Sequence, residues 1–129
     1  MNLESPTATV NKSANDLFDF LTDVKNFEMI MPENTDTFEA TENSFIFALK
    51  GMPKIKLKLE KHERPVTIVL ASAAEKFPFT LTGNIVALEE NTSSINLQFA
   101  GDFNPMMAMM IKNPLQKFIN TLVENLGKL

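Results

Sequence analysis

Residues 104–126, NPMMAMMIKNPLQKFINTLVENL, decide the fold, because they form the one long helical pattern in the chain. Apolar residues recur there at steps of three and four, which places them on one face of an α-helix. These residues are Met107, Ile111, Leu115, Phe118, Leu122 and Leu126. The opposite stripe, which we expect to meet water, consists of Lys112, Gln116, Asn120 and Glu124. An apolar face of this length needs a broad apolar partner, and the preceding sequence supplies a series of short strands.

Pro114 lies inside this helical pattern. It has no N–H to donate, and its ring crowds the carbonyl of Met110, which costs about 3 kcal/mol in a straight helix. Residues 113–116, NPLQ, also read as a new helix start, with an Asn cap and Pro at the first position. The sequence therefore allows a kinked helix or two separate helices, and the common face of Ile111 and Leu115 favours the kink. In either case, the Met-rich turns before Pro114 are mechanically distinct, and we expect them to act as a movable lip.

The sequence before the long helix predicts one strand, two short helices and then six strands. The predicted strands are residues 2–10, 35–41, 44–51, 53–63, 66–73, 79–90 and 94–102, and the predicted helices are residues 14–22 and 24–30. Short turns between consecutive strands indicate an antiparallel sheet. Helices segregated from such a sheet make the fold class α+β.

Several residues give these elements their expected boundaries and irregularities. Ser13 is a helix N-cap, with Asp16 three residues later in an approximate capping box. Pro6 indicates an edge position or a bulge in the first strand. Gly83 indicates a bulge or a sharp bend that curls the sheet.

Length and composition exclude several classes of protein. The chain has 129 residues, which predicts a single domain, residues 1–129. Its formal charge of −4 argues against general nucleic-acid affinity. There is no cysteine, no basic-apolar leader and no apolar run of membrane-spanning length, so we expect a cytoplasmic protein with no transmembrane segment. Eleven Phe and eight Met, with no Tyr or Trp, predict a purely apolar interior that is either a filled core or a real cavity.

Residues 9–32, TVNKSANDLFDFLTDVKNFEMIMP, carry a family resemblance. The helix start at Ser13, followed by Phe18, Leu21, Asp23 and a closing Met-Pro, resembles the START-like SRPBCC superfamily. This superfamily includes the birch-pollen allergen group, START lipid-transfer domains and polyketide cyclase/dehydrase proteins, and its short coenzyme Q-binding subgroup is similar in size. The element order extends the resemblance over the whole chain. It implies a helix-grip fold, in which a sheet of about seven strands curls around the last helix and leaves an apolar cavity.

The sequence offers little for catalysis, and we predict no catalytic residue, no metal site and no cofactor. His62 falls by strand alternation with Lys58 and Glu60 on the wet face, and no acidic or histidine cluster has metal-ligand spacing. A basic stripe predicts a solvated strand face or, alternatively, a surface for an acidic partner or an anionic membrane. Its members are Lys50, Lys54, Lys56, Lys58, Lys61 and Arg64.

We therefore expect a binder or carrier of a small apolar molecule, which the family resemblance makes lipid-, quinone- or polyketide-like. The alternatives are a protein-interaction module with a filled core and a cyclase/dehydrase-like enzyme. The residues expected to line the cavity between the sheet and the last helix are Phe47, Leu57, Leu70, Ser72, Phe79, Leu81, Leu97, Phe99, Met107, Met110, Ile111, Leu115 and Phe118.

Overall fold

A computed structural model describes residues 1–50, 54–72 and 78–129. In chain order the elements are β1 (Asn2–Glu4), β2 (Ala8–Val10), α1 (Ala14–Thr22), the 3₁₀-helix η1 (Val24–Ile30), β3 (Thr35–Ala40), β4 (Ser44–Leu49), β5 (Ile55–Glu63), β6 (Thr67–Ser72), β7 (Phe79–Glu89), β8 (Thr92–Gly101) and α2 (Pro105–Leu126). The predicted order of strands and helices is confirmed. The outer ends of the strands predicted to reach residues 51, 53 and 73 lie outside the described residues.

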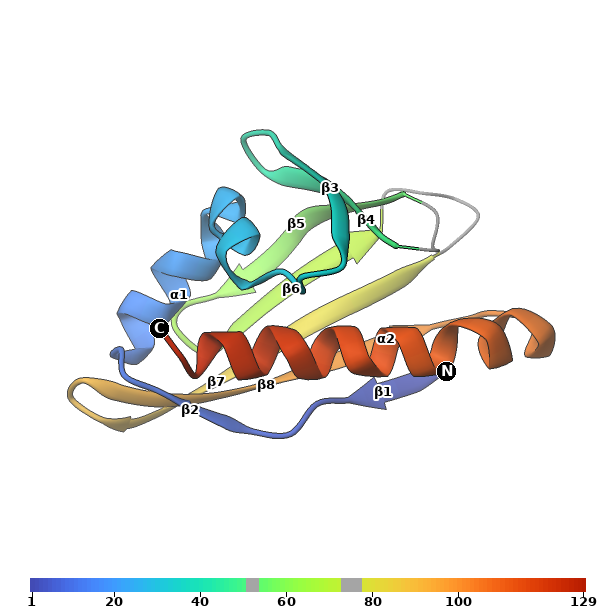
Figure 1. Cartoon of the computed structure of the whole chain (residues 1–129). Coiled ribbons are helices and arrows are strands. Elements are labelled where there is room, and N and C mark those ends of the chain that lie inside the picture. Colours follow the sequence, from blue (N-terminus) through green and yellow to red (C-terminus); the bar gives the residue numbers. More distant parts are fainter. Residues whose placement is uncertain (51–53, 73–77) are drawn as a thin grey trace.

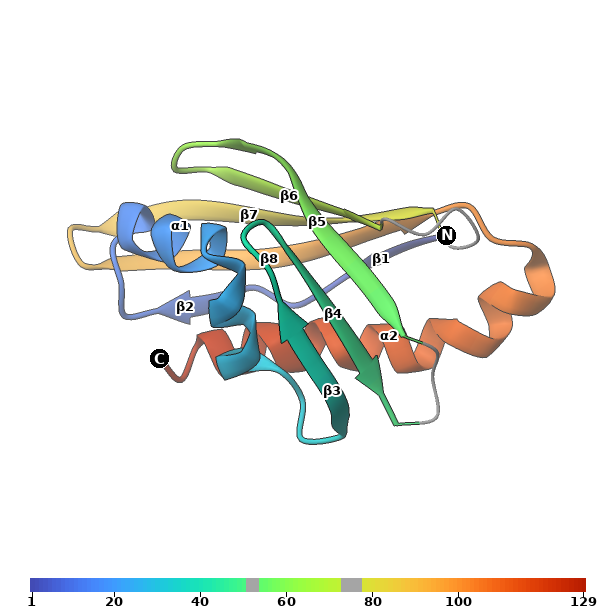
Figure 2. The ribbon, with the colours of Figure 1, turned by 90° about the horizontal axis from the view of Figure 1, so that it is seen from above.

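All strands join one antiparallel sheet in the order β1-β8-β7-β6-β5-β4-β3, and β2 also pairs with β8. The sheet is curved, and α2 runs along its concave side (Figures 1 and 2). This arrangement confirms the α+β helix-grip fold. Figure 1 also shows α1 and η1 at the end of the sheet where α2 ends, so the three helices share one side of the sheet.

The predicted first strand is divided in two at Ser5 and Pro6. The backbone N–H of Ser5 donates to the carbonyl of Leu97 (2.8 Å), and the Ser5 hydroxyl accepts from the Leu97 N–H (2.8 Å). The side chain of Ser5 thus replaces a backbone acceptor of the ladder where the chain bends. Because of this division, the sheet has eight strands rather than seven.

Side-chain caps begin the first two helices, and that of Ser13 was predicted. The Ser13 hydroxyl accepts from the Asp16 N–H (3.1 Å) at the start of α1. The Asp23 carboxylate accepts from the Lys25 N–H (3.4 Å) and begins η1. The apolar side chains of α1 and η1 then enter the core, as Leu17 and Ile30 do, both with no exposed surface.

The long helix α2 is continuous, so the alternative of two separate helices is wrong. Asn104 caps it by accepting from the Met107 N–H (2.8 Å), and Pro114 lies inside it. Figure 2 shows that the first turns bend away from the axis of the rest. The expectation that its polar stripe meets water is only partly right. The Gln116 amide donates to the carbonyl of Glu4 (3.0 Å), so this part of the stripe covers β1.

Apart from the break at Pro6, the irregularities described below lie at positions that the sequence did not predict. The ladder of β7 runs unbroken through Gly83, and the register shift occurs at Leu88, so the expectation of a bulge at Gly83 is wrong. A second shift, at Glu60 of β5, changes the faces of the residues that follow. His62 pairs with the buried Ile68, so it does not share the face of Lys58 as predicted, but the residue is exposed to solvent as expected.

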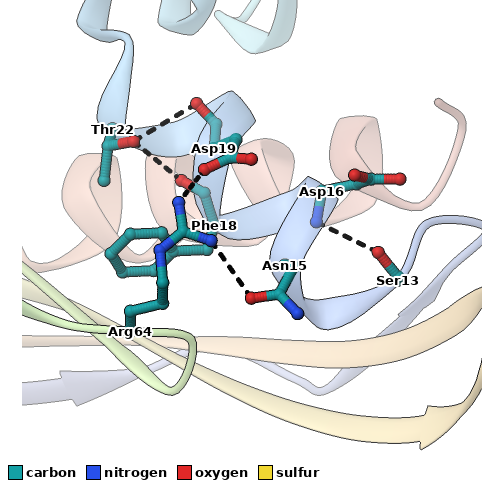
Figure 3. Close-up of polar contacts among 7 residues, drawn as sticks. All are labelled: Ser13, Asn15, Asp16, Phe18, Asp19, Thr22 and Arg64. Atoms are coloured by element: carbon teal, nitrogen blue, oxygen red, sulfur yellow. Dashed lines mark hydrogen bonds and ion pairs between the residues drawn. The ribbon is translucent and has the colours of Figure 1, made fainter.

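Arg64 does not belong to the basic stripe, because it reaches the first helix (Figure 3). Its guanidinium donates to the Asn15 side chain (3.1 Å), pairs with the Asp19 carboxylate and lies 4.7 Å from the centre of the Phe18 ring. His62 packs against the same ring at 5.5 Å between ring centres. These contacts join the β5–β6 turn to α1.

Candidate functional site

The inner face of the sheet is an apolar surface, because the strand register aligns its inward residues. Leu81 of β7 lies opposite Phe99 of β8 and Leu70 of β6. Leu57 of β5 lies opposite Ser72 of β6, so the Ser72 hydroxyl is on this inner face. The surface facing α2 is therefore built almost wholly from aliphatic and aromatic groups.

Most residues predicted to line the space between the sheet and α2 are brought together there. The buried members are Phe47, Leu57, Leu70, Phe79, Leu81, Leu97, Phe99, Leu115 and Phe118, and the half-buried members are Ser72, Met107 and Ile111. The remaining predicted residue, Met110, is 73% exposed. Met110 belongs to the first turns of α2, which leave the axis of the rest of the helix (Figure 2).

A row of phenylalanines crosses from η1 to α2, and the sequence analysis missed part of it. Phe27 stacks on Phe45 (4.8 Å between ring centres), Phe45 contacts Phe47 (5.8 Å), and Phe47 stacks on Phe118 (5.0 Å). The alternation of Phe45 with Phe47 along one strand was the available signal for including Phe45. Stacked pairs of this kind contribute beyond their buried area.

The interior is filled at the end nearest α1. Between Gly83 and the end of α2, the free volume is about 10 Å³. Its walls are Leu21, Phe27, Ile30, Ile68, Leu70, Leu81, Gly83, Leu97 and Leu126. This space is at the lower limit for one water molecule. A ligand at this end would require the core to repack.

A larger space opens at the middle of α2. A groove of about 510 Å³ separates the helix from the edge formed by the ends of β3 and β4. We call it the Pro114 groove, and its walls are Pro32, Asn34, Leu49, Lys50, Asn113, Pro114, Lys117, Phe118 and Thr121. Its volume is within the range of small-molecule sites.

The helical wall of the Pro114 groove has a simple sequence origin. Pro114, Lys117, Phe118 and Thr121 follow one another at helical steps of three and four, so they share one side of α2. The sequence analysis named Phe118 but missed its neighbours. Their spacing was a detectable signal, but the strand edge that faces them was not.

The opposite wall is held by backbone contacts. The N–H of Lys50 donates to the carbonyl of Asn34 (2.9 Å), and the Thr35 N–H and hydroxyl both donate to the carbonyl of Pro32 (3.2 and 2.7 Å). Leu49, which precedes Lys50, is 4% exposed, as is Phe118 on the helix side. The groove thus combines a fixed strand edge with buried apolar residues from both walls.

The first turns of α2 present apolar side chains to solvent. Met106, Met109 and Met110 are 76%, 82% and 73% exposed, whereas the helix residues from Leu115 onward on the inner face are buried. Met107 and Ile111 are half-buried. This part of the helix is held by fewer packed side chains than the part after Pro114.

The described residues contain no group of three or more histidine and acidic side chains placed to hold a metal ion. His62 lines a hollow of about 410 Å³ with Lys61, Glu63 and Thr67, and its ring faces Phe18. This packing gives His62 a structural role in the contact between β5 and α1. None of the helices in the described part of the chain has the length and apolar content needed to cross a membrane.

Known proteins resemble this chain in structure rather than in sequence. No protein-family model and no curated protein sequence matches it. The protein XoxI from Bacillus cereus superposes with a TM-score of 0.76 at 12% identity, covering 98% of this chain and 93% of that one. A START superfamily protein from Mycobacterium smegmatis gives a TM-score of 0.69 at 12% identity, covering 98% and 94%.

Norcoclaurine synthase from Thalictrum flavum, solved in complex with dopamine and hydroxybenzaldehyde, gives a TM-score of 0.72 at 10% identity. The match covers 99% of this chain and 84% of the synthase. These likenesses span nearly the whole chain at low identity. They establish a START-like fold, as the sequence predicted, and leave function to the residues of the site.

Proposed function

We propose that this protein binds a small apolar molecule between its sheet and α2, and that the molecule enters through the Pro114 groove. The observation that carries the proposal is the groove itself, about 510 Å³ over the buried side chains of Leu49 and Phe118. Four of its nine lining residues are apolar, and the other five, Asn34, Lys50, Asn113, Lys117 and Thr121, are polar or charged. A concavity of this volume, with apolar groups and a few placed polar groups, can hold a small molecule. A lipid-, quinone- or polyketide-like compound fits this chemistry.

The bend in α2 supports this route. Before Pro114, the inward residues Met107 and Ile111 are only half-buried, and Met109 and Met110 are exposed. Movement of these turns therefore breaks few contacts of the core, and unbranched Met side chains repack readily. Elements that open for ligands are drawn from such weakly packed parts of a fold. The packed half of α2 keeps the fold intact while the first half moves.

The test uses N-phenyl-1-naphthylamine, an uncharged apolar dye whose fluorescence rises in an apolar site. We expect saturable binding to the purified protein with one dye per chain. The variant Thr121→Phe places a ring in the Pro114 groove and should weaken binding at least tenfold. Glu124→Phe, on the exposed side of the next turn, adds the same ring outside the groove and should bind as the unaltered protein does.

Equal weakening by both variants would contradict the proposed route, and absence of saturable binding would contradict the proposed function. Native mass spectrometry of protein purified from its own host adds an independent readout. A bound apolar compound in stoichiometric amount would identify the ligand. The Thr121→Phe protein should carry less of it.

A second candidate, a protein-interaction module, is favoured by the filled interior near Gly83 and by a row of lysines on β5. Lys56 and Lys58 of β5 point outward, and the shift at Glu60 keeps Lys61 on the same face. This row would suit an acidic partner. Dye binding would count against this candidate, and a protein that is empty in native mass spectra and binds no dye would support it.

A further inference from the structure

We propose that the ligand is a single-chain amphiphile with an anionic end, and that Lys50 and Lys117 bind this end at the rim of the Pro114 groove. This inference rests on the proposed function and specifies the class of its ligand. A carboxylate, sulfate or phosphate on an aliphatic chain has the required chemistry. The apolar chain lies over Leu49 and Phe118, and the anion lies between the two ammonium groups.

The two lysines come from opposite walls. Lys50 follows the last residue of β4, and Lys117 lies on the side of α2 that faces the groove. Each is next in sequence to a buried apolar residue of the same groove, Leu49 and Phe118 respectively. This repeated pairing of cation and apolar group on both walls matches a molecule that has one charged end and one apolar end.

Both cations are available for a ligand. Within the described part of the chain, neither Lys50 nor Lys117 forms an ion pair with a carboxylate. The described residues that line the groove include no acidic side chain, and its remaining polar groups are Asn34, Asn113 and Thr121. Neutral amides and a hydroxyl are compatible with an anion and add hydrogen-bond donors around it.

The local charge is opposite to that of the whole protein. The chain carries a formal charge of −4, which repels anions in general, yet this groove has two positive side chains and no negative one among its described lining residues. Within about a Debye length, roughly 10 Å at 0.1 M salt, nearby charges dominate. A cationic apolar molecule is therefore disfavoured at the rim, and an anionic one is favoured.

The experiment compares dodecanoate and dodecyltrimethylammonium, each below its critical micelle concentration, with dodecanol below its solubility limit. Their dissociation constants are measured by displacement of N-phenyl-1-naphthylamine and by calorimetry at low salt. We expect dodecanoate to bind about tenfold more tightly than dodecanol, since each exposed lysine contributes about threefold. Dodecyltrimethylammonium should bind more weakly than both.

The double variant Lys50→Gln, Lys117→Gln should abolish the preference for dodecanoate and leave dodecanol binding unchanged. The matched control is Lys56→Gln, Lys128→Gln, which removes two exposed lysines elsewhere. Both variants change the formal charge from −4 to −6, because two positive charges are lost in each (−4 − 2 = −6). The control should keep the preference, and higher salt should reduce it only in proteins that retain both groove lysines.

Equal affinity for dodecanoate and dodecanol, with the dye still bound, would overturn this inference and leave the proposed function in place. An equal loss of the preference for dodecanoate in the two double variants would also overturn it. The preference would then depend on the net charge of the protein rather than on the two lysines of the groove. Failure of every apolar probe to bind would remove the proposed function itself. Cosedimentation with phosphatidylglycerol vesicles that needs Lys50 and Lys117, without binding of free dodecanoate, would assign the lysines to a membrane surface and overturn the inference.

Discussion

Replacement of Gly83 by Ala should stabilise the protein, and the same change at Gly101 should destabilise it. A Cβ built on Gly83 would lie 3.5 Å from Leu97 Cδ2 and 3.7 Å from Ile95 Cδ1, which are ordinary van der Waals distances. It would project into the space of about 10 Å³ at this end of the interior. The backbone of Gly83 is not in the left-handed region, so Ala meets no conformational penalty.

Two contributions determine how much Gly83→Ala changes the free energy of unfolding. Ala reduces the conformational freedom of the unfolded chain, which stabilises a compatible position by about 0.4–1 kcal/mol. Burial of the added methyl group contributes up to about 0.8 kcal/mol. We therefore expect Gly83→Ala to raise the free energy of unfolding by about 1–1.5 kcal/mol.

Gly101 is the matched control, because it also lies on the inner side of a central strand, opposite Phe79. There a Cβ would lie 2.8 Å from Phe79 Cβ, 2.7 Å from Phe103 Cε2 and 3.1 Å from the carbonyl of Pro78. Phe103 Cε2 is the far end of a rotatable side chain, but the Cβ of Phe79 is fixed to the backbone. Overpacking of this kind costs about 1–3 kcal/mol, so the two variants should differ by about 2–4 kcal/mol.

Urea unfolding followed by circular dichroism at 25 °C measures both changes, with equal m-values as the check on two-state behaviour. A loss of 1 kcal/mol or more in Gly83→Ala would refute the description of this part of the interior. The variant also separates the two ends of the interior. Binding of N-phenyl-1-naphthylamine should be unchanged by Gly83→Ala, because the proposed route lies beside Pro114.

Two further variants test contacts that hold the scaffold. Ser5→Ala removes the hydroxyl that accepts from the buried N–H of Leu97, which should lower the free energy of unfolding by about 1–3 kcal/mol in urea titrations. Arg64→Ala removes the contacts to Asp19 and the Phe18 ring. Because these groups are half exposed, its cost should be only about 1 kcal/mol and should shrink with added salt, as thermal unfolding at two salt concentrations measures.

Nearby exposed residues provide the controls. Thr7→Ala changes a hydroxyl beside the same strand break without touching the ladder, and Lys61→Ala removes a cation from the same turn region without a contact to α1. Both should stay within about 0.5 kcal/mol of the unaltered protein. A Ser5→Ala effect no larger than that of Thr7→Ala would show that the strand break does not depend on the hydroxyl.

The sequence predicted the fold because its main signals are local. Cap residues such as Ser13 and Asn104 act within three positions, and the alternation of strands and the period of α2 extend over one element each. These signals gave the helices, the strand order and nearly all buried residues of the inner face. They failed where the pairing between two strands determines on which face of the sheet a residue lies. The shift at Glu60, which puts the exposed His62 on the face of Ile68 rather than on that of Lys58, appears only in the register of β5 against β6.

The candidate site was harder to predict than the fold for the same reason. Lys117 and Phe118 are adjacent on a helix, and Leu49 and Lys50 are adjacent at a strand end. The sequence of neither segment indicates that these two pairs lie on opposite walls of one groove. Their proximity depends on the curvature of the sheet, which accumulates over all its strands. The site therefore had to be read from the structure, although each wall was visible in the sequence.

The position of Pro114 links the stability of this fold to its proposed binding. A helix buried along its whole length would fill the concave side of the sheet, as the part from Leu115 to Leu126 already does near Gly83. Because Pro114 cannot donate to the carbonyl of Met110, the helix can bend there, the turns before it leave the axis of the rest (Figure 2), and Pro114 lines the groove. Pro114 therefore separates a loosely packed half of the helix from a packed half, which supports the fold and whose residues Lys117, Phe118 and Thr121 form the helical wall of the groove.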